Sequence, residues 1–446
     1  MLTALFGTDG IRGRVGDSPV SPEEVLKIGW AAGTALKVLG KGRQVVLGKD
    51  TRVSGYLFES LLQAGFIAAG VDTALTGPLP TPAIAHLTKT IRASAGVVIS
   101  ASHNPYYDNG IKFFQGDGHK FDDALEQEIE KQFHQPMRTA SDLGKATRIP
   151  DAAGRYIEFC KSAFPQTQSL SECCLVVDCA NGACYDLAPR VFRELGANVR
   201  VIANEPDGYN INQDCGTEST AGLVEAVIKH KANAGIAFDG DGDRLVMVDE
   251  GGNVLDGDKI LFLLARHRQQ MGTLAGGVVG TIMSNYGFEK SLGRYGIDLC
   301  RTRVGDRHVL EELRSRGWCL GGEPSGHIVC FDKTTTGDGI VAALQVLNAM
   351  VSTDTALSLL TGDLDSYPQA RANVTLPLDR ADPLSVVRGT RVQQMVSEVE
   401  SLLGTDGRVV VRCSGTEPVV RVMVEGSDEE LVTRYCRQIT AVIADE

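Results

Sequence analysis

Residues 234–244, which read AGIAFDGDGDR, combine the features that decide the fold of this chain. The apolar run 234–238 has the length and composition of a buried β-strand, and it stops at an aspartate. Strands of a parallel sheet often end in this way, where they run into a functional loop at the carboxyl edge of the sheet. Other apolar runs that stop at a Gly, Ser or Asp are found at residues 44–48, 96–99 and 277–280.

Helical patterns alternate with these runs, as in residues 57–69 and 223–230, and the alternation predicts an α/β fold with largely parallel sheets. The length of 446 residues suggests about three domains. Polar, broken stretches at 135–155, 249–252 and 364–368 instead divide the chain into four segments. We therefore predict domains over residues 1–150, 151–252, 253–366 and 367–446.

The composition indicates a soluble globular protein with a small-molecule partner. Hydrophobic residues make up 43% of the chain and charged residues 22%, which are ordinary values. The net charge of −12 disfavours nucleic acid or an anionic membrane as a partner. A local cluster of Arg side chains and backbone N–H groups can still bind a small anion. The residues do not decide the oligomeric state, and a homodimer stays open.

The cysteines and the first residues predict a reduced cytoplasmic protein. The 11 cysteines are scattered, and the opening MLTALF lacks the basic segment of a signal peptide. Four cysteines cluster around the apolar run 175–177 but lack the paired spacing of a zinc site, so we expect core thiols. They are Cys173, Cys174, Cys179 and Cys184.

Asp239, Asp241 and Asp243 form a candidate cation site. In an extended strand alternate carboxylates lie about 6.6 Å apart, but the intervening glycines let the backbone curl so that they converge. Oxygen ligands without His or Cys favour Mg²⁺. An EF-hand is excluded because its sixth position is Arg244, where the turn requires Gly, and both flanks read as strands. A solvated acidic turn remains the alternative.

Residues 100–105, SASHNP, place the hydroxyl of Ser102 in a tight loop, where it is a candidate to carry a phosphoryl group. Pro105 pushes Asn104 into an extended conformation. We expect His103 to be poorly placed to deprotonate Ser102, because neighbouring residues of extended backbone point to opposite faces. The G-x-S-x-G elbow of many hydrolases is absent. An ordinary Ser or Asx turn remains the alternative.

Two further loops offer groups for a sugar and for a phosphate. Residues 321–327, GGEPSGH, supply a carboxylate, a hydroxyl and an imidazole that suit sugar hydroxyl or amine groups. Residues 412–418, RCSGTEP, followed by Arg421, supply hydroxyls, backbone N–H groups and guanidinium groups for a phosphate. The preceding run 409–411 reads as a strand. An ordinary turn and a surface hairpin remain the alternatives.

Two basic segments near the N-terminus, residues 6–13 (FGTDGIRG) and 48–52 (GKDTR), complete the set of motifs. Together with Lys112, we expect their Arg and Lys side chains to neutralise a transferring phosphoryl group.

These loops, in this order, resemble those of the α-D-phosphohexomutase superfamily from Phe6 to Arg421. Residues 6–13 and 99–114 are most similar to the bacterial phosphoglucosamine mutase family within it. The resemblance implies three related α/β domains and a C-terminal α+β domain with an antiparallel sheet, around a central cleft. It also implies interconversion of glucosamine 6-phosphate and glucosamine 1-phosphate, through a glucosamine 1,6-bisphosphate intermediate, on the route to UDP-N-acetylglucosamine.

The resemblance assigns roles to individual residues. Ser102 would be the phosphoserine, and its oxygen would complete one Mg²⁺ site with Asp239, Asp241 and Asp243. Catalytic residues in the same pocket would be Arg12, His103 and Lys112, the last as an acid/base. The remaining predicted substrate-binding residues are Arg244, Arg307, Glu323, Ser325, His327, Arg412, Ser414, Gly415, Thr416 and Arg421. Cys413 departs from the Lys or Pro often found there in the family and, unlike Lys, contributes no charge unless it is ionised, which leaves the assignment standing.

Three alternatives stay open from the sequence. A phosphomannomutase/phosphoglucomutase would share the architecture, and the loops at 305–308 and 321–327 would decide between the two. A metal-dependent sugar phosphatase would result if the cleft admitted water. A non-catalytic sugar-phosphate sensor would not need Ser102, Lys112 and three aspartates together.

Overall fold

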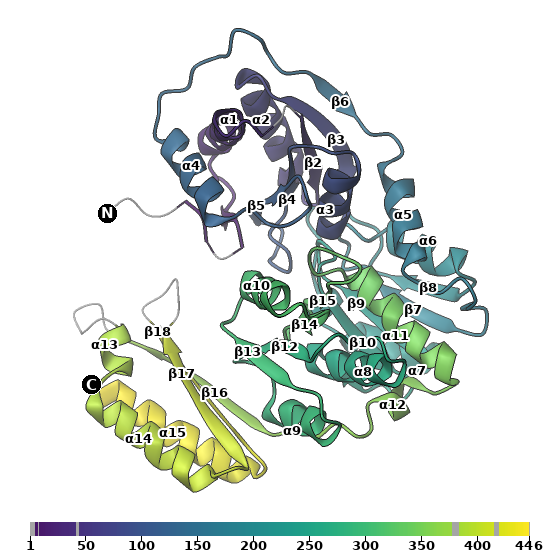
Figure 1. Ribbon diagram of the computed structural model, residues 1–446, viewed down its shortest axis with the longest axis vertical. Coiled ribbons are helices and arrows are strands. Elements are labelled where there is room, and N and C mark those ends of the chain that lie inside the picture. The colour runs from purple at the N-terminus through teal and green to yellow at the C-terminus, as the bar shows by residue number, and fades with distance from the viewer. Residues whose placement is uncertain (1–4, 8, 42–43, 377–382, 414–418, 446) are drawn as a thin grey trace. The chain divides into compact units, whose positions relative to one another are not determined.

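The computed structural model describes residues 5–7, 9–41, 44–376, 383–413 and 419–445 (Figure 1). Its contacts divide the chain into two compact units, one formed by Met1–Thr281 with Cys300–Gly362 and the other by Ile282–Leu299 with Asp363–Glu446. Three sheets belong to the first unit and one to the second. Among the described residues, no helix is both long and apolar enough to cross a membrane.

The first sheet is mixed and carries the serine loop. Its strands, in spatial order, are β1 (Ile11–Arg14), β5 (Asp108–Gln115), β4 (Ala95–Ile99), β2 (Gln44–Lys49), β3 (Asp72–Pro78) and β6 (Ala146–Arg148). The last four strands in this order run parallel, whereas β5 is antiparallel to both β4 and β1. The short connection from β4 to β5 places Ser102 just beyond the carboxyl end of β4, and Lys112 lies on β5 opposite Val98.

Four helices pack against this first sheet. They are α1 (Pro22–Val38), α2 (Ser54–Ala68), α3 (Thr81–Thr90) and α4 (Asp123–Phe133). Helix α1 begins with a capping box, in which Ser21 and Glu24 each bond the backbone N–H of the other, and Pro22 suits the first turn. Helices α1, α2 and α4 share one apolar core with the sheet.

The second sheet carries the aspartate loop. Its strands, in spatial order, are β11 (Val254–Leu255), β10 (Leu245–Asp249), β9 (Ala234–Phe238), β7 (Cys174–Asp178) and β8 (Asn198–Ile202). Strand β7 is parallel to β8 and β9, and β10 turns back antiparallel to β9. The accompanying helices are α5 (Ala152–Ser162), α6 (Leu187–Glu194), the short η1 (Gly216–Glu218) and α7 (Ala221–His230).

The third sheet carries the loop predicted to bind the sugar. Its strands, in spatial order, are β13 (Leu299–Thr302), β12 (Val278–Thr281), β14 (Leu320–Gly322) and β15 (Ile328–Cys330). The antiparallel pair β14–β15 brackets residues 323–327. Its helices are α8 (Gly257–Gln270), α10 (Asp306–Arg316), α11 (Gly339–Thr353) and α12 (Leu357–Leu360).

The second unit contains the antiparallel sheet. Strand β18 (Val419–Gly426) lies between β16 (Gln369–Thr375) and β17 (Gly407–Cys413). Its helices are α9 (Tyr286–Arg294), α13 (Pro383–Val387), α14 (Thr390–Leu403) and α15 (Glu429–Asp445). Helices α14 and α15 and the sheet enclose a separate apolar core.

The predicted fold class is confirmed, as are the predicted strands, which correspond to β2, β4, β9, β12 and β17. Helix α2 begins at Ser54, before the predicted residue 57. Its N-cap residue, Val53, has no capping side chain, so no N-cap signal in the sequence marks this start. The four domain bounds remain predictions. Helix α9 lies in the predicted third segment but groups with the second unit.

Candidate active site

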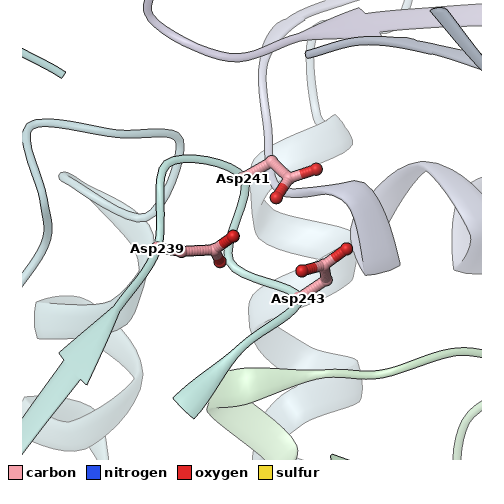
Figure 2. A group of neighbouring side chains, drawn as sticks. All are labelled: Asp239, Asp241 and Asp243. Atoms are coloured by element: carbon pink, nitrogen blue, oxygen red, sulfur yellow. The ribbon is translucent and has the colours of Figure 1, made fainter. Parts of the chain in front are cut away.

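Asp239, Asp241 and Asp243 lie in the tight turn between β9 and β10, and their side chains converge (Figure 2). One carboxylate oxygen from each lies within 4.8 Å of the other two. All three residues are buried. Gly242 makes the turn with a φ of +71°, and a Cβ there would lie only 2.4 Å from Cys184 Sγ. The curled backbone predicted from the glycines is therefore confirmed.

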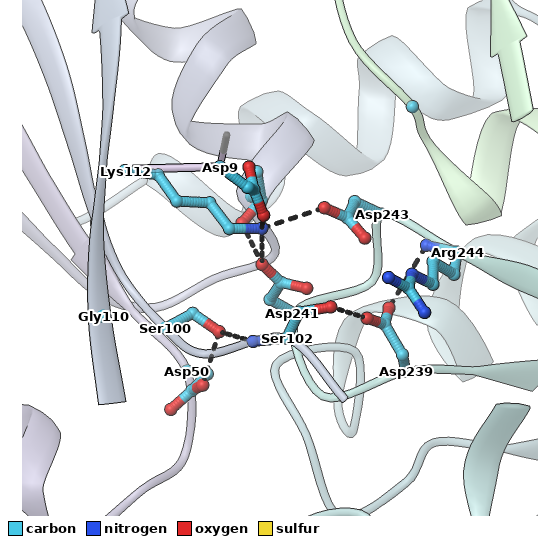
Figure 3. A network of polar contacts seen from close by, with 12 residues as sticks. Asp9, Asp50, Ser100, Ser102, Gly110, Lys112, Asp239, Asp241, Asp243 and Arg244 are labelled. Atoms are coloured by element: carbon cyan, nitrogen blue, oxygen red, sulfur yellow. Dashed lines mark hydrogen bonds and ion pairs between the residues drawn. The ribbon is translucent and has the colours of Figure 1, made fainter. Parts of the chain in front are cut away.

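An ammonium group and a backbone N–H contact these carboxylates. Lys112 Nζ lies 2.8 Å from Asp241 Oδ2 and 3.0 Å from Asp243 Oδ2, as Figure 3 shows. The backbone N–H of Arg244 donates to Asp239 Oδ1 over 3.2 Å. Burial, followed by repulsion from Asp243 and Asp241, raises the pKa of Asp239 well above its usual value. The mutual repulsion of the three carboxylates is therefore not fully offset by the positive groups around them.

The remaining oxygens fit a hard cation. Among the described residues, Asp241 Oδ1 and Asp243 Oδ1 are buried and have no hydrogen-bond partner. A buried acceptor without a hydrogen-bond partner destabilises the fold unless a bound ion serves as its partner. The donors are carboxylate oxygens, which are the ligands that Mg²⁺ prefers. The residues present therefore fit the predicted metal.

Ser102 lies beside this cluster. Its Oγ donates a hydrogen bond to Asp239 Oδ2 over 2.5 Å, and the residue is 1% exposed. Its backbone is left-handed, with a φ of 52°. The expectation that His103 points away from Ser102 rested on extended backbone and is wrong, since His103 Nδ1 lies 3.4 Å from Ser102 Oγ. Burial, followed by the nearby charge of Arg244, lowers the pKa of His103 to about 4, so its imidazole is neutral at pH 7.

Arg52 holds the backbone of the serine loop. Its guanidinium donates to the carbonyl oxygens of Ser102 (2.9 Å), Asn104 (2.9 Å), Pro105 (2.5 Å) and Asp108 (3.2 Å). The side chain is fully buried. The expectation that Arg52 neutralises a transferring phosphoryl group is therefore wrong, because its donors are already used by the loop.

Asp50 completes this support. It accepts a hydrogen bond from Arg52 Nε over 2.8 Å and another from Ser100 Oγ over 2.7 Å. Ser100 Oγ in turn accepts the backbone N–H of Ser102 over 2.9 Å. The neighbouring Lys49 forms an ion pair with Glu59 at 2.5 Å and so is also removed from the predicted phosphoryl site.

Asp9 brings the predicted residues Arg12 and Lys112 together. Its carboxylate forms an ion pair with Arg12 and lies 3.5 Å from Lys112 Nζ. Burial alone would raise the pKa of Asp9, but the charges of Lys112, Lys120 and Arg12 outweigh burial and hold it well below its usual value. Burial alone would likewise lower the pKa of Lys112, but Asp241, Asp243 and Asp9 raise it well above its usual value. Lys112 is therefore an ammonium group at neutral pH.

The loop between β14 and β15 reaches the same cluster. His327 is buried, with Nδ1 3.8 Å from Asp243 Oδ1 and Nε2 3.6 Å from Asp306 Oδ2. Glu323 Oε1 accepts the backbone N–H of Gly305 over 3.0 Å, and Ser325 is exposed. Glu323 and His327 are therefore held, whereas Ser325 is open to solvent.

Two predicted substrate residues are engaged by other protein groups. Arg244 Nη1 lies 3.5 Å from Glu218. Arg307 pairs with Asp123 at 2.7 Å and Glu126 at 2.8 Å. The guanidinium of Arg307 is thus directed to helix α4 in the first domain.

The predicted phosphate loop belongs to the second unit. Arg412 on β17 and Arg421 on β18 are directly opposite each other in the antiparallel register. Burial, followed by repulsion from Arg421, lowers the pKa of Arg412. Together with Arg371 and Asn373 they line a cavity of about 390 Å³. Ser414, Gly415 and Thr416 lie outside the described residues.

Comparison with known proteins relates this geometry to a family. Four phosphoglucomutase/phosphomannomutase family models match the chain: alpha/beta/alpha domain I at residues 3–139, domain II at 154–252, domain III at 256–367 and the C-terminal domain at 373–442. The phosphoglucosamine mutase of Enterobacter sp. (strain 638) is 54% identical over 440 residues, which are 98% of this chain and 98% of that protein. The chain belongs to the phosphoglucosamine mutase family.

Solved structures share the architecture of this phosphoglucosamine mutase family member. A phosphoglucomutase/phosphomannomutase family protein from Burkholderia thailandensis is 25% identical, with a TM-score of 0.84, over 99% of this chain and 97% of its own. An Aspergillus fumigatus N-acetylphosphoglucosamine mutase, solved in complex with GlcNAc-6P and magnesium, has a TM-score of 0.70 at 16% identity. The two proteins match over 99% of this chain and 95% of the fungal one, which shows the shared fold.

Sequence reasoning assigned no role to Asp9 or Asn212 and a different role to Arg52, although all three organise the site of this phosphoglucosamine mutase family member. Asp9 holds Arg12 and Lys112, Arg52 holds the serine loop, and Asn212 donates to the carbonyl oxygens at both ends of residues 102–104. The only sequence signal was the position of Asp9 and Arg52 within glycine-containing segments. Nothing in the sequence around Asn212 marked it.

Proposed function

We propose that this protein interconverts glucosamine 6-phosphate and glucosamine 1-phosphate, with a phosphorylated Ser102 as the donor and acceptor of the phosphoryl group. As a member of its family the chain is an isomerase of the intramolecular phosphotransferase class. The observation that carries the proposal is the contact of Ser102 Oγ with the three-carboxylate cluster, 2.5 Å from Asp239. Glucosamine 1,6-bisphosphate would be the intermediate.

In the first half-reaction the free hydroxyl of the sugar attacks the phosphorus on Ser102. A bond from phosphorus to the sugar oxygen forms and the bond to Ser102 Oγ breaks. The sugar hydroxyl loses its proton and Ser102 Oγ gains one, which gives the bisphosphate and a free serine. Lys112 and Arg12 stabilise the negative charge of the transferring group. Since the pKa of Lys112 is raised, its Nζ stays protonated and gives up its proton reluctantly, so this residue is suited to stabilise charge rather than to act as the acid or base.

In the second half-reaction the intermediate presents its other phosphate to Ser102 Oγ. The same groups then act in reverse, and Ser102 recovers its phosphoryl group. Asp239, Asp241, Asp243 and Ser102 would hold one Mg²⁺, which as a Lewis acid stabilises phosphoryl oxygens when it is bound. Glu323 and His327 would read the sugar, while Arg412 and Arg421 would bind the phosphate that is not reacting.

The burial of the serine serves this chemistry. Ser102 is 1% exposed and Asp241 is fully buried, so few water molecules can reach the transferring group. Water would otherwise hydrolyse the phosphoserine and turn the enzyme into a phosphatase.

A competition between sugars tests the proposal. Protein primed with glucosamine 1,6-bisphosphate should turn over glucosamine 6-phosphate faster than glucose 6-phosphate in the presence of Mg²⁺. Ser102→Ala should abolish turnover, whereas Ser60→Ala, which changes an exposed serine of helix α2, should not. A preference for glucose 6-phosphate would favour a phosphoglucomutase and refute the proposal that glucosamine 6-phosphate is the substrate. Full activity of Ser102→Ala would refute the phosphoserine.

A further inference from the structure

Lys120 lies between two carboxylates from segments far apart in the chain. Its ammonium group forms ion pairs with Asp9, from the segment before β1, and with Asp306, the first residue of α10. The side chain of Lys120 is 12% exposed and that of Asp306 is 9% exposed. An ion pair removed from solvent to this degree is geometrically restrictive, because either partner left alone would be a buried charge.

Each of the two carboxylates that pair with Lys120 also contacts a residue of the candidate active site. Asp9 contacts Arg12 and Lys112. Asp306 lies 3.6 Å from His327, whose other ring nitrogen lies 3.8 Å from Asp243. Lys112 also pairs with Asp243 at 3.0 Å, so the contacts of Asp9 and of Asp306 both reach the aspartate loop.

Arg307 adds a second link between the same two elements. It donates to Asp123 over 2.7 Å, to Glu126 over 2.8 Å and to the carbonyl oxygen of Phe121 over 2.6 Å. The first turn of α10 is thus tied to residues 120–126 through two successive residues, Asp306 and Arg307. The residue before this turn, Gly305, bonds the carboxylate of Glu323.

We propose that Lys120 and Arg307 are positioning residues that hold the loop carrying Glu323 and His327 at a fixed place relative to Ser102. The inference rests on the proposed function for its kinetic consequence. In that reaction the bisphosphate intermediate must stay bound while it exchanges one phosphate for the other. An enzyme whose sugar loop is loosely held releases the intermediate more often, and each release leaves Ser102 without a phosphoryl group.

The test compares Lys120→Met with the wild-type enzyme in turnover of glucosamine 6-phosphate. The concentration of glucosamine 1,6-bisphosphate that gives the half-maximal rate should rise by roughly tenfold or more, because a small misplacement of substrate-positioning groups is costly. Bisphosphate released into solution should rise with it. Lys120→Arg, which keeps the charge, should recover part of the loss. Lys131→Met, which removes an exposed ion pair on α4, is the control and should behave as wild type.

Arg307→Met provides a second variant should Lys120→Met fail to fold, with Arg316→Met on the exposed side of α10 as its control. Arg307→Met should also raise the concentration of glucosamine 1,6-bisphosphate that gives the half-maximal rate. A wild-type bisphosphate requirement in a folded Lys120→Met or Arg307→Met protein would overturn the inference.

Amide hydrogen exchange separates this inference from the proposed function. Residues 118–126 and 305–310 should exchange faster in both variants than in their controls, whichever sugar the enzyme uses. Unchanged exchange would overturn the inference. Faster exchange in a protein that does not act on glucosamine 6-phosphate would support the positioning role and refute the proposed function.

Discussion

Ser102 adopts a left-handed backbone conformation, with a φ of 52°, that a serine normally avoids. Such a conformation costs about 1–2 kcal/mol for a residue with a side chain, so the surrounding structure must enforce it. Four carbonyl oxygens of the loop accept hydrogen bonds from Arg52, and Ser100 Oγ accepts the N–H of Ser102 itself. The result is a hydroxyl directed at Asp239 rather than at solvent.

At Gly240 the backbone of the aspartate loop closely approaches that of the serine loop. A Cβ at this position would lie 2.6 Å from the carbonyl oxygen of Ser102 and 2.8 Å from Ile211 Cδ1. Gly240→Ala should therefore displace Ser102 from the carboxylates and lower kcat by about a hundredfold, the scale of a misplaced reacting group. Steady-state kinetics and circular dichroism would measure the effect and the retained fold.

The matched control is Gly222→Ala in helix α7. A Cβ at Gly222 meets open space, so this change should leave kcat as in wild type and stabilise the helix by about 0.5–1 kcal/mol. Equal kcat in Gly240→Ala and wild type would show that the close approach of the two loops is not needed for turnover.

At the scale of elements, the sequence predicts the structures that depend on neighbouring residues, namely single strands and turns. Apolar runs predict β2, β4 and β9 because buried strands need a continuous apolar stretch, and the glycines beside Asp241 predict the curled turn. Contacts between sheets could not be predicted in this way. The pairs Lys112–Asp241 and Lys120–Asp306 join residues far apart in the chain, and they depend on how whole domains pack. The left-handed Ser102 likewise leaves no mark in its own sequence.

Helix α11 begins at a buried acidic cap. Asp338 accepts the N–H of Val341 over 3.0 Å and the hydroxyl of Tyr156 over 2.8 Å. Burial raises the pKa of Asp338 to about 6 despite these donors. The unfolded chain has an ordinary carboxyl pKa of about 3.9, so the folded state binds the proton more tightly between these values. The ionised carboxylate therefore lowers the free energy of unfolding. This destabilisation is absent below about pH 4 and complete above about pH 6.

Asp338→Asn should remove this cost and keep a capping oxygen. The variant should gain stability over wild type at pH 8, by up to about 1–3 kcal/mol, and should gain little at pH 4. Thermal unfolding midpoints of both proteins at the two pH values would measure the difference. A variant that loses more stability at pH 8 than at pH 4 would contradict the raised pKa.

At the scale of the whole molecule, the residues predicted to bind substrate are divided between the two compact units. The serine, the aspartates and the sugar loop belong to the first unit, and Arg412 and Arg421 belong to the second. These two guanidinium groups are cross-strand neighbours, and like charges placed opposite each other destabilise a sheet. An anion between them would relieve the repulsion, which is what the proposed phosphate subsite requires.

Arg421→Met should accordingly weaken substrate binding. Loss of a hydrogen bond to a charged group costs about 1.5–3 kcal/mol, so the KM for glucosamine 6-phosphate should rise by about tenfold or more. Inorganic phosphate should raise the unfolding temperature of the wild type more than that of the variant. Arg437→Met, an exposed change on α15, is the control. An unchanged KM in Arg421→Met would place the distal phosphate elsewhere.

The central claim is that Ser102 carries the phosphoryl group during turnover. The most direct measurement is mass spectrometry of peptides from enzyme quenched during turnover of glucosamine 6-phosphate primed with isotopically labelled glucosamine 1,6-bisphosphate. The account predicts labelled phosphate on the peptide that contains Ser102, and its absence from the Ser102→Ala protein. Continued turnover with the label on another residue, or on none, would contradict it.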